Sequence, residues 1–236
     1  MERPLEEVLA EQQRYYRERA GEYEDWWLRR GRFDHGPEAA ARWWEEVAEL
    51  RTALDAFAPA GRVLELACGT GLWTERLAPH ASELTALDAS EEVIALAREK
   101  VPAANVSFVP SDIFAWEPDG LYDVVFFSFW LSHVPSAMMS SFFAKVARAL
   151  APGGRVFLID SAPSDRASAH DHDTSEPGEL ARRLLADGRE YTIVKHWFEA
   201  DALQALLDGL GWNARISQTP EFFVYGQATS PGSRGL

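Results

Sequence analysis

The chain has 236 residues, 47% of them hydrophobic, which is enough for one domain with a sizeable buried core. Its 37 acidic and 23 basic side chains give a formal net charge of −14, and this disfavours a nucleic-acid partner, which requires a basic surface. The single cysteine, Cys68, excludes an internal disulfide framework and a cysteine-rich metal site. The N-terminus lacks the apolar core of a signal peptide, and no run approaches the ~20 apolar residues of a membrane span. We therefore expect a soluble cytoplasmic protein with no membrane partner.

Two helices are expected within residues 1–58, which we interpret as a helical cap. Pro4 and Pro37 each suit the first turn of a helix, and the two helices would end near Ala20 and Phe57. The segment is rich in Tyr and Trp, and one interpretation is that these rings only pack the helices onto the rest of the protein. The alternative is a cap that closes over a ligand and forms one wall of its pocket.

The segment at residues 62–71, Arg-Val-Leu-Glu-Leu-Ala-Cys-Gly-Thr-Gly, predicts a strand, a tight glycine turn and then a helix. Gly69 and Gly71 allow backbone angles that other residues avoid, and the start of the next helix offers free N–H groups to a ligand. The third glycine of a dinucleotide fingerprint is missing, because that position is Thr74. Residues 63–75 also lack the Lys of a triphosphate-binding loop. The turn therefore indicates a ligand without a phosphate bridge.

An acidic residue, Asp88, ends the next apolar run. Its distance along the chain from Gly71 is close to the ~20 residues that separate a glycine turn from a carboxylate bound to ribose hydroxyls. We infer that the ligand is a nucleoside. The alternative for Asp88 is a purely structural one, as a cap for the helix that begins near Ser90.

Strand and helix patterns alternate regularly through residues 59–160, the predicted ligand-binding core. Strands are expected near residues 62–67, 83–88, 106–109, 121–127 and 154–160, and helices near residues 72–79, 90–100 and 136–150. Because these strands are largely apolar, they suit a parallel sheet that is covered on both faces. Ligands of such sheets bind beyond the carboxyl ends of the strands, where the sequence has Gly69, Asp88, Asp112 and Ser128.

The regular pattern breaks after residue 160. Residues 161–197 are mostly polar, with one strand-like run at 189–195, and a segment of this length is usually functional or disordered. We interpret it as a lid over the substrate side. Residues 198–228 predict a helix at 198–210 and two closing strands, at 212–216 and 222–226, so that residues 1–228 form a single domain. The tail at residues 229–236 is expected to be disordered.

Five segments resemble, in order and spacing, the motifs of the class I S-adenosylmethionine (SAM) dependent methyltransferases, and the chain is similar to their small-molecule branch. These segments are residues 62–71, Asp-Ala-Ser at 88–90, Ser-Asp-Ile at 111–113, Phe-Phe-Ser-Phe-Trp at 126–130 and Leu-Ala-Pro-Gly-Gly at 150–154. The resemblance implies an α/β, Rossmann-like sheet of seven strands with the last one antiparallel. It also implies an insertion between strand five and its following helix, SAM as the cofactor and S-adenosylhomocysteine (SAH) as the product.

The resemblance assigns cofactor contacts to the cap, the glycine turn and the strand ends: Tyr16, Tyr23, Glu65, Gly69, Thr70, Gly71, Asp88, Ala89, Asp112, Ile113, Ser128 and Phe129. In the family, the carboxylate at Asp88 accepts from the ribose. The carboxylate at Asp112 accepts from the adenine amine while Ile113 covers the ring; the alternative is an ordinary turn aspartate. The acid at Glu65 steadies the glycine turn or the amino group of SAM.

Substrate contacts are expected from Trp26, Trp27, His35, Trp130 and His133. By motif position His133 is the histidine nearest the expected reaction centre, and its ordinary pKa near neutrality suits a general base. The alternative is a structural histidine that bonds to the backbone at the start of the next helix. His170 and His172 flank Asp171, a pattern that can bind a metal, but no third ligand is near in sequence, so we predict no metal.

The predicted function is transfer of the SAM methyl group to an O, N or C atom of a small, partly hydrophobic metabolite by in-line displacement. Two alternatives stay open. One is a SAM-binding protein that transfers no methyl group and acts as a scaffold, sensor or non-redox cyclase. The other is a NAD(P)-dependent oxidoreductase, which the missing third glycine disfavours. We expect a small-molecule acceptor as partner, no nucleic acid, and a monomer or homodimer.

Overall fold

The computed structural model describes residues 3–172 and 178–232 and has one large mixed sheet at its centre. The order of its seven strands is β3-β2-β1-β4-β5-β9-β8. Their bounds are Gly61–Leu66 (β1), Ala81–Asp88 (β2), Val106–Pro110 (β3), Tyr122–Ser128 (β4), Leu150–Ser161 (β5), Asn213–Gln218 (β8) and Phe223–Thr229 (β9). Strands β1 to β5 pair in parallel, whereas β9 is antiparallel to both β5 and β8. This confirms the predicted Rossmann-like sheet with an antiparallel last strand.

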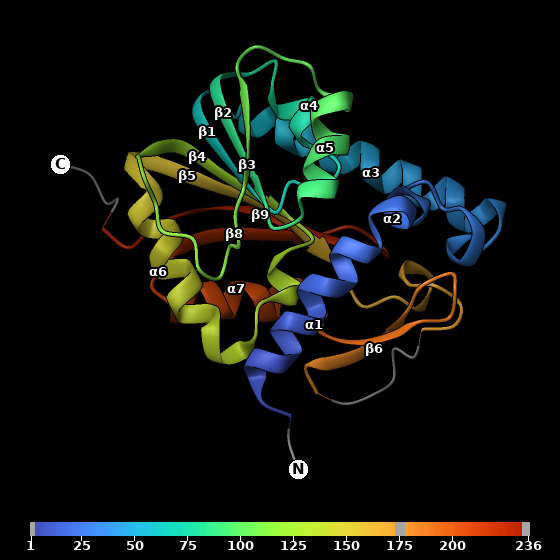
Figure 1. The fold of residues 1–236 in the computed structure, drawn as a ribbon. Coiled ribbons are helices and arrows are strands. Elements are labelled where there is room, and N and C mark those ends of the chain that lie inside the picture. The colour runs from blue at the N-terminus through green and yellow to red at the C-terminus, as the bar shows by residue number, and fades with distance from the viewer. Residues whose placement is uncertain (1–2, 173–177, 233–236) are drawn as a thin grey trace.

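Helices cover both faces of this sheet, as Figure 1 shows. One face carries α3 (Pro37–Phe57), α4 (Thr74–Leu77) and α5 (Glu91–Lys100), and the other carries α6 (Met139–Ala149) and α7 (Ala200–Gly209). The central strand β4 is buried on both sides because it lies between these two helical layers, and its run of Val and Phe supplies apolar side chains to each. The edge strand β3, by contrast, exposes three of its five residues.

The local sequence explains where the helices begin and end. Helix α3 starts with Pro37 after Gly36, whose φ of +88° few other residues adopt, and α5 is capped by the Ser90 hydroxyl, which accepts from the N–H of Val93 at 3.2 Å. Helix α4 is shorter than the predicted 72–79. Pro79 has no N–H with which to continue the helical hydrogen bonds, and the turn after Gly71 delays the first helical residue to Thr74.

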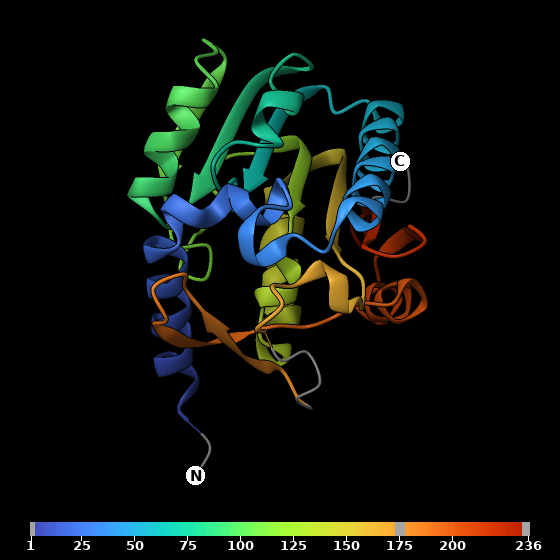
Figure 2. The ribbon, with the colours of Figure 1, turned by 90° about the vertical axis from the view of Figure 1, so that its right-hand side faces the viewer.

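The cap and the insertion meet at the edge of the molecule. The described part of the predicted cap, residues 3–58, contains α1 (Leu5–Glu18), η1 (Ala20–Glu22), α2 (Tyr23–Trp27), η2 (Gly31–Phe33) and α3. The insertion contains η5 (Asp165–Ala167) and a two-stranded antiparallel sheet of β6 (Leu180–Leu184) and β7 (Glu190–Val194). Figures 1 and 2 both show α1 lying along this small sheet. The insertion follows β5 and precedes α7, as predicted.

Side chains of α1 complete the hydrogen bonding of β7. The Glu11 carboxylate accepts from the N–H of Thr192 at 2.7 Å, and the Gln12 carboxamide oxygen accepts from the N–H of Val194 at 2.8 Å. Helix α1 therefore occupies the place of a neighbouring strand beside β7. We call α1 and β7 together the roof.

Three predictions about the chain's limits can be compared with these elements. Thr229 is the last residue of β9, so the predicted tail begins too early; residues 233–236 lie outside the described residues. None of the helices in the described ranges combines the length and apolar character needed to cross a membrane. The division into cap, core, lid and closing segment, and the cytoplasmic location, stay predictions.

Candidate functional site

Two neighbouring cavities lie beyond the carboxyl ends of β1, β2, β4 and β5, beneath the cap. The first, which we call the strand-end cavity, is lined by Gln12, Gln13, Tyr16, Tyr23, Ala67, Asp88, Ala89, Ser90, Val93, Asp112, Ile113, Phe114, Ser128, Phe129, Trp130 and His133. The second, the basic cavity, is lined by Tyr15, Tyr16, Arg19, Tyr23, Trp26, Phe33, Phe129, His133, Ser161, Ala167, Ser168, His172, Arg183, Lys195 and Trp197. Four of these side chains line both cavities, so the cavities meet at Tyr16, Tyr23, Phe129 and His133.

Asp88 holds the glycine turn against the end of β2. One carboxylate oxygen accepts from the N–H of Gly69 and the other from the N–H of Ser90, each at 3.0 Å. Burial raises the pKa of Asp88, while these two hydrogen bonds act in the opposite direction by stabilising the charged form. A carboxylate has about four acceptor sites, so this one can still accept from a ligand in the strand-end cavity.

Tyr23 of α2 packs directly on the glycine turn. Gly69 has φ of +55°, and a Cβ there would lie 2.8 Å from the Tyr23 hydroxyl oxygen, closer than real contacts allow. Two non-glycine residues beside the strand-end cavity also have left-handed backbones: Ala67 after β1 (φ +55°) and Phe129 after β4 (φ +53°). Backbone strain of this kind, about 1–3 kcal/mol each, concentrates at ligand sites.

Eight of the predicted cofactor contacts line the strand-end cavity: Tyr16, Tyr23, Asp88, Ala89, Asp112, Ile113, Ser128 and Phe129. Asp112 also accepts from the N–H of Phe114 at 2.9 Å, which fixes the turn after β3. Phe114 and Val93 add apolar walls that the motifs did not identify. The sequence could have indicated both, because Phe114 directly follows Ile113 and Val93 lies on the buried face of α5.

The other four predicted contacts, Glu65, Gly69, Thr70 and Gly71, are not among the residues that line the cavity. The Glu65 carboxyl accepts from the hydroxyl of Thr74 at 2.6 Å, and burial raises its pKa to about 8. The hydroxyl of Thr70 donates to Glu24 at 3.1 Å, and Glu24 forms an ion pair with Lys100. In this arrangement the four residues support the turn, and their contact with the cofactor stays a prediction.

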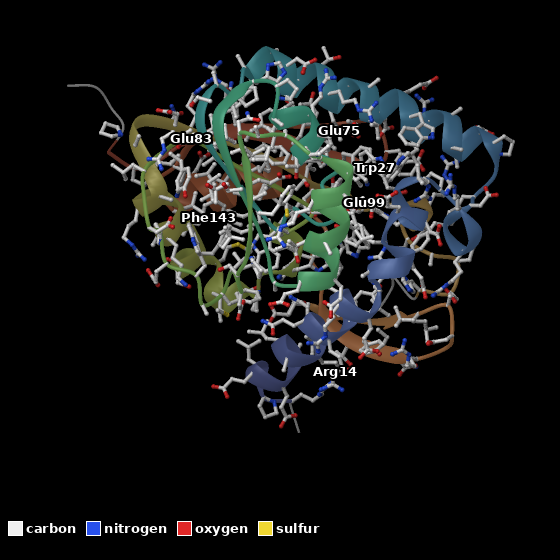
Figure 3. The ribbon with its side chains drawn as sticks, turned by 45° about the horizontal axis from the view of Figure 1, so that its top comes forward. Arg14, Trp27, Glu75, Glu83, Glu99 and Phe143 are labelled. Atoms are coloured by element: carbon white, nitrogen blue, oxygen red, sulfur yellow. The ribbon has the colours of Figure 1, made fainter. Side chains whose placement is uncertain are left out.

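The predicted substrate residues separate into three environments. Trp26 lines the basic cavity and donates its indole N–H to the carbonyl of Ala167 at 2.8 Å. Trp130 lines the strand-end cavity instead, and its indole nitrogen is buried with no partner among the described residues. Trp27 points toward α3 (Figure 3), where its carbonyl accepts from the indole of Trp43 at 3.1 Å. Outside both cavities, His35 bonds to the carbonyl of Ser168 at 2.8 Å.

His133 lies at the junction of the cavities with both ring nitrogens engaged. A carbonyl can only accept, so Nδ1 carries the proton and donates to the carbonyl of Val194 at 2.7 Å. The hydroxyl of Tyr16 then donates to Nε2, also at 2.7 Å. Burial, with the nearby charge of Lys195, moves the pKa of His133 well below its usual value, and burial raises that of Tyr16. Both groups are neutral, and this geometry favours the structural alternative over the general base, which stays a prediction.

Three cations of the basic cavity were not predicted. Arg19 follows α1, Arg183 belongs to β6 and Lys195 follows β7. The sequence pattern that could have identified Arg183 is the alternation of a strand, in which consecutive side chains point to opposite faces. Arg182 is accordingly exposed, while Arg183 is buried. Residues 161–188 looked loop-like in sequence, and this concealed the period.

The two histidines that flank Asp171 have other partners in the structure. His170 bonds to the carbonyl of Asp34 at 2.6 Å, and Asp171 pairs with Arg32 at 2.6 Å. His172 lines the basic cavity, and burial with the charges of Arg183 and Arg32 lowers its pKa to about 3. In the ranges that the structure describes, no three His, Cys, Asp or Glu side chains are grouped to hold a metal ion.

Comparisons with known proteins agree with this architecture. A family model described as "Methyltransferase domain" matches residues 63–154. Nodulation protein S of Rhizobium tropici is 33% identical over 102 residues, which are 42% of this chain and 42% of that protein. Ubiquinone biosynthesis O-methyltransferase of Bordetella pertussis is 34% identical over 141 residues, 50% of this chain and 56% of that protein. The chain thus spans about half the length of the curated relatives it matches.

Two solved structures cover nearly the whole chain. A structure described as "DhpI-SAH complex structure" is 35% identical, with a TM-score of 0.76, over 96% of this chain and 98% of that one. Another, described as "DhpI-SAM-HEP complex", is 36% identical, with a TM-score of 0.77, over 94% of this chain and 98% of that one. The fold is that of a Rossmann-like methyltransferase. The chain belongs to the class I SAM-dependent methyltransferases, a family that takes its methyl group from SAM, as predicted from the five motifs.

Proposed function

We propose that this protein binds SAM in the strand-end cavity and transfers its methyl group to a small molecule in the basic cavity. The observation that carries the proposal is that the two cavities share Tyr16, Tyr23, Phe129 and His133. A methyl donor and its acceptor must approach within bonding reach, and two cavities that meet at one wall allow this. The family relationship supports the cofactor assignment.

The residues of the strand-end cavity fit a nucleoside. Asp88 would hold the ribose hydroxyls with the acceptor sites that Gly69 and Ser90 leave open. Asp112 would accept from the adenine amine, and Ile113 would cover the ring. The buried indole N–H of Trp130 is one further donor that a ligand could satisfy, because leaving it unpaired is unfavourable.

The residues at the junction position the reactants and exclude water. When bound, SAM supplies a methyl group attached to a positively charged sulfur. The rings of Tyr16, Tyr23 and Phe129 suit a positive charge, because aromatic faces attract cations. The roof closes this junction from the outside, since Gln12 also donates to the carbonyl of His133 at 3.1 Å. Catalysis would then come mainly from holding the acceptor and the methyl group in line.

Isothermal titration with SAM, SAH and NADH tests the cofactor part of this proposal. We expect micromolar binding of SAM and SAH and none of NADH. Tight binding of NADH alone would contradict the proposal and favour the oxidoreductase alternative. The transfer step is tested separately, by following SAH formation against a panel of small acceptors. Binding of SAM with no SAH formed on the whole panel would favour the alternative of a non-transferring SAM-binding protein.

A further inference from the structure

The basic cavity has an unusual charge composition for this chain. The protein has 37 acidic and 23 basic side chains, yet the side chains that line this cavity include Arg19, Arg183 and Lys195 and no Asp or Glu among the described residues. Most of its remaining walls are aromatic rings and small hydroxyls. The cavity is therefore a region of concentrated positive charge in an acidic protein.

Arg183 is the most isolated of these cations. Arg183 is only 6% exposed, and its guanidinium donates to the backbone carbonyl of Arg182 at 2.9 Å. Within residues 3–172 and 178–232, no carboxylate lies at ion-pair distance from it. A buried charge is strongly unfavourable without a counter-ion, so an anion in the cavity would stabilise the Arg183 guanidinium.

Arg19 has a similar environment. Its guanidinium carbon lies 5.4 Å from the ring centroid of Tyr23 and 5.6 Å from that of Phe33. These aromatic contacts orient the side chain without neutralising it. In the described part of the chain, no carboxylate lies at ion-pair distance from Arg19, and Glu22 acts on its charge only from farther away. Because Tyr23 lies at the junction of the two cavities, Arg19 is close to the expected methyl-transfer position.

Lys195 is only partly neutralised. Its ammonium donates to the hydroxyl of Ser132 at 2.9 Å and lies 3.8 Å from Asp160. The Asp160 carboxylate also accepts from the backbone N–H groups of Ser132 and Ser161, at 2.9 and 2.7 Å. One fully buried carboxylate, shared in this way, offsets at most one of the three cations.

We propose that the basic cavity binds the methyl acceptor as a small organic anion, whose carboxylate or phosphoryl oxygens are held by Arg19 and Arg183, with Lys195 as a third cation. This inference rests on the proposed function, because it concerns the acceptor side of the same site. Guanidinium groups suit such oxygens because they donate two parallel hydrogen bonds, and the absence of lining carboxylates removes competition for them. The aromatic walls select for small size and an apolar remainder.

The test compares Arg183→Gln with Arg182→Gln, a matched control. Both changes remove one positive charge from β6, but the Arg182 side chain is exposed and pairs with Glu190 on the opposite face. Inorganic phosphate and acetate are titrated into each protein at constant ionic strength, with and without SAH, and followed by calorimetry and melting temperature. We expect at least one of the two anions to bind the wild type and Arg182→Gln, and to bind Arg183→Gln at least tenfold more weakly.

A second readout separates an anion site from a structural role. Without added anion, Arg183→Gln should melt at a higher temperature than the wild type, because an uncompensated buried charge is removed. A structural role predicts a lower melting temperature. Equal anion affinity in Arg183→Gln and wild type, or a lower melting temperature of the anion-free variant, would overturn the proposal.

Arg19→Gln, with Arg17→Gln on the exposed side of α1 as its control, repeats the test at an independent position. The two control variants, Arg182→Gln and Arg17→Gln, should keep the wild-type affinity for SAH, because neither arginine lines either cavity. If neither the wild type nor any variant binds SAH, the proposed function is wrong. The anion titration of the SAH-free protein still tests whether the basic cavity binds an anion.

Discussion

The hydroxyl of Tyr16 donates a hydrogen bond of 2.7 Å to Nε2 of His133, and this contact joins helix α1 to η3 (Leu131–His133), the turn that follows β4. The other ring nitrogen of His133 donates to the carbonyl of Val194 in β7. One imidazole therefore connects the cap, the core and the insertion. It has no free nitrogen with which to accept a proton from an acceptor molecule.

His133→Gln should therefore retain most of the methyl-transfer activity. We expect kcat to fall by less than about tenfold, whereas loss of a general base typically costs about 10²–10⁴-fold. The pH profile of wild-type kcat/KM should show no limb near the ordinary histidine pKa of about 6.5. The measurement is SAH formation between pH 5 and 9 for both proteins. A drop beyond 100-fold, together with loss of such a limb, would establish His133 as the base.

Asp88→Ala should weaken SAM and SAH binding by roughly 1.5–3 kcal/mol, the range for a lost hydrogen bond to a charged group. Asp201→Ala, an exposed change in α7, is the control. Because Asp88 also holds Gly69 and Ser90, circular dichroism should first establish that the variant is folded. Isothermal titration then measures both affinities, and an unchanged affinity for SAH in the folded variant would contradict the ribose assignment.

Glu65→Gln should change how stability depends on pH. Burial raises the folded-state pKa of Glu65 from 4.5 to about 8, so between these values the carboxyl is protonated when folded and ionised when unfolded. Wild-type stability is therefore lost as pH rises through this window. The glutamine variant cannot ionise and keeps its bond partner Thr74, so it should exceed the wild type at pH 8 by roughly 1–3 kcal/mol.

Denaturant unfolding at pH 5 and pH 8 measures this difference. Glu75→Gln is the control, because Glu75 is exposed on α4 (Figure 3) and should shift stability equally at both pH values. Parallel pH curves for wild type and Glu65→Gln would show that the buried carboxyl is ionised in the folded protein.

Gln12→Ala should loosen the roof. The Gln12 side chain accepts from the N–H of Val194 and donates to the carbonyl of His133, and both groups are buried. Removing it leaves two backbone groups unpaired, each at a cost of about 1–3 kcal/mol. Hydrogen exchange of residues 192–194 should accelerate in this variant. In Gln13→Ala, an exposed neighbour on α1, exchange of the same residues should stay at the wild-type rate.

The sequence predicts the residues of the strand-end cavity better than those of the basic cavity. The glycine turn, Asp88 and Asp112 follow strand ends, and the carboxyl ends of parallel strands meet at one edge of a sheet, so local patterns are enough to bring them together. The seven-stranded sheet with an antiparallel last strand was implied by the family resemblance rather than by local patterns, and it is confirmed.

The acceptor side depends on contacts that no local pattern contains. Arg19 and Arg183 converge because α1 lies beside the β6–β7 pair, a relationship between the two ends of the chain. Trp26 and Trp27 were predicted to have the same role because they are identical neighbours in sequence. Adjacent residues of a helix point in different directions, however, and of the two only Trp26 lines the basic cavity. His35 bonds to the carbonyl of Ser168, a contact that sequence alone does not reveal, and its substrate contact stays a prediction.

The pairing of α1 with β7 also has a consequence for the order in which the protein forms during synthesis. Residues 5–18 leave the ribosome early, but their hydrogen-bonding partners in β7 follow only after β1 to β5 have been made. A contact between such distant segments closes late, because the chain between them must first become compact. We therefore expect the strand-end cavity to be closed late in folding, and a truncated chain that ends before β7 would carry the glycine turn without a closed cavity.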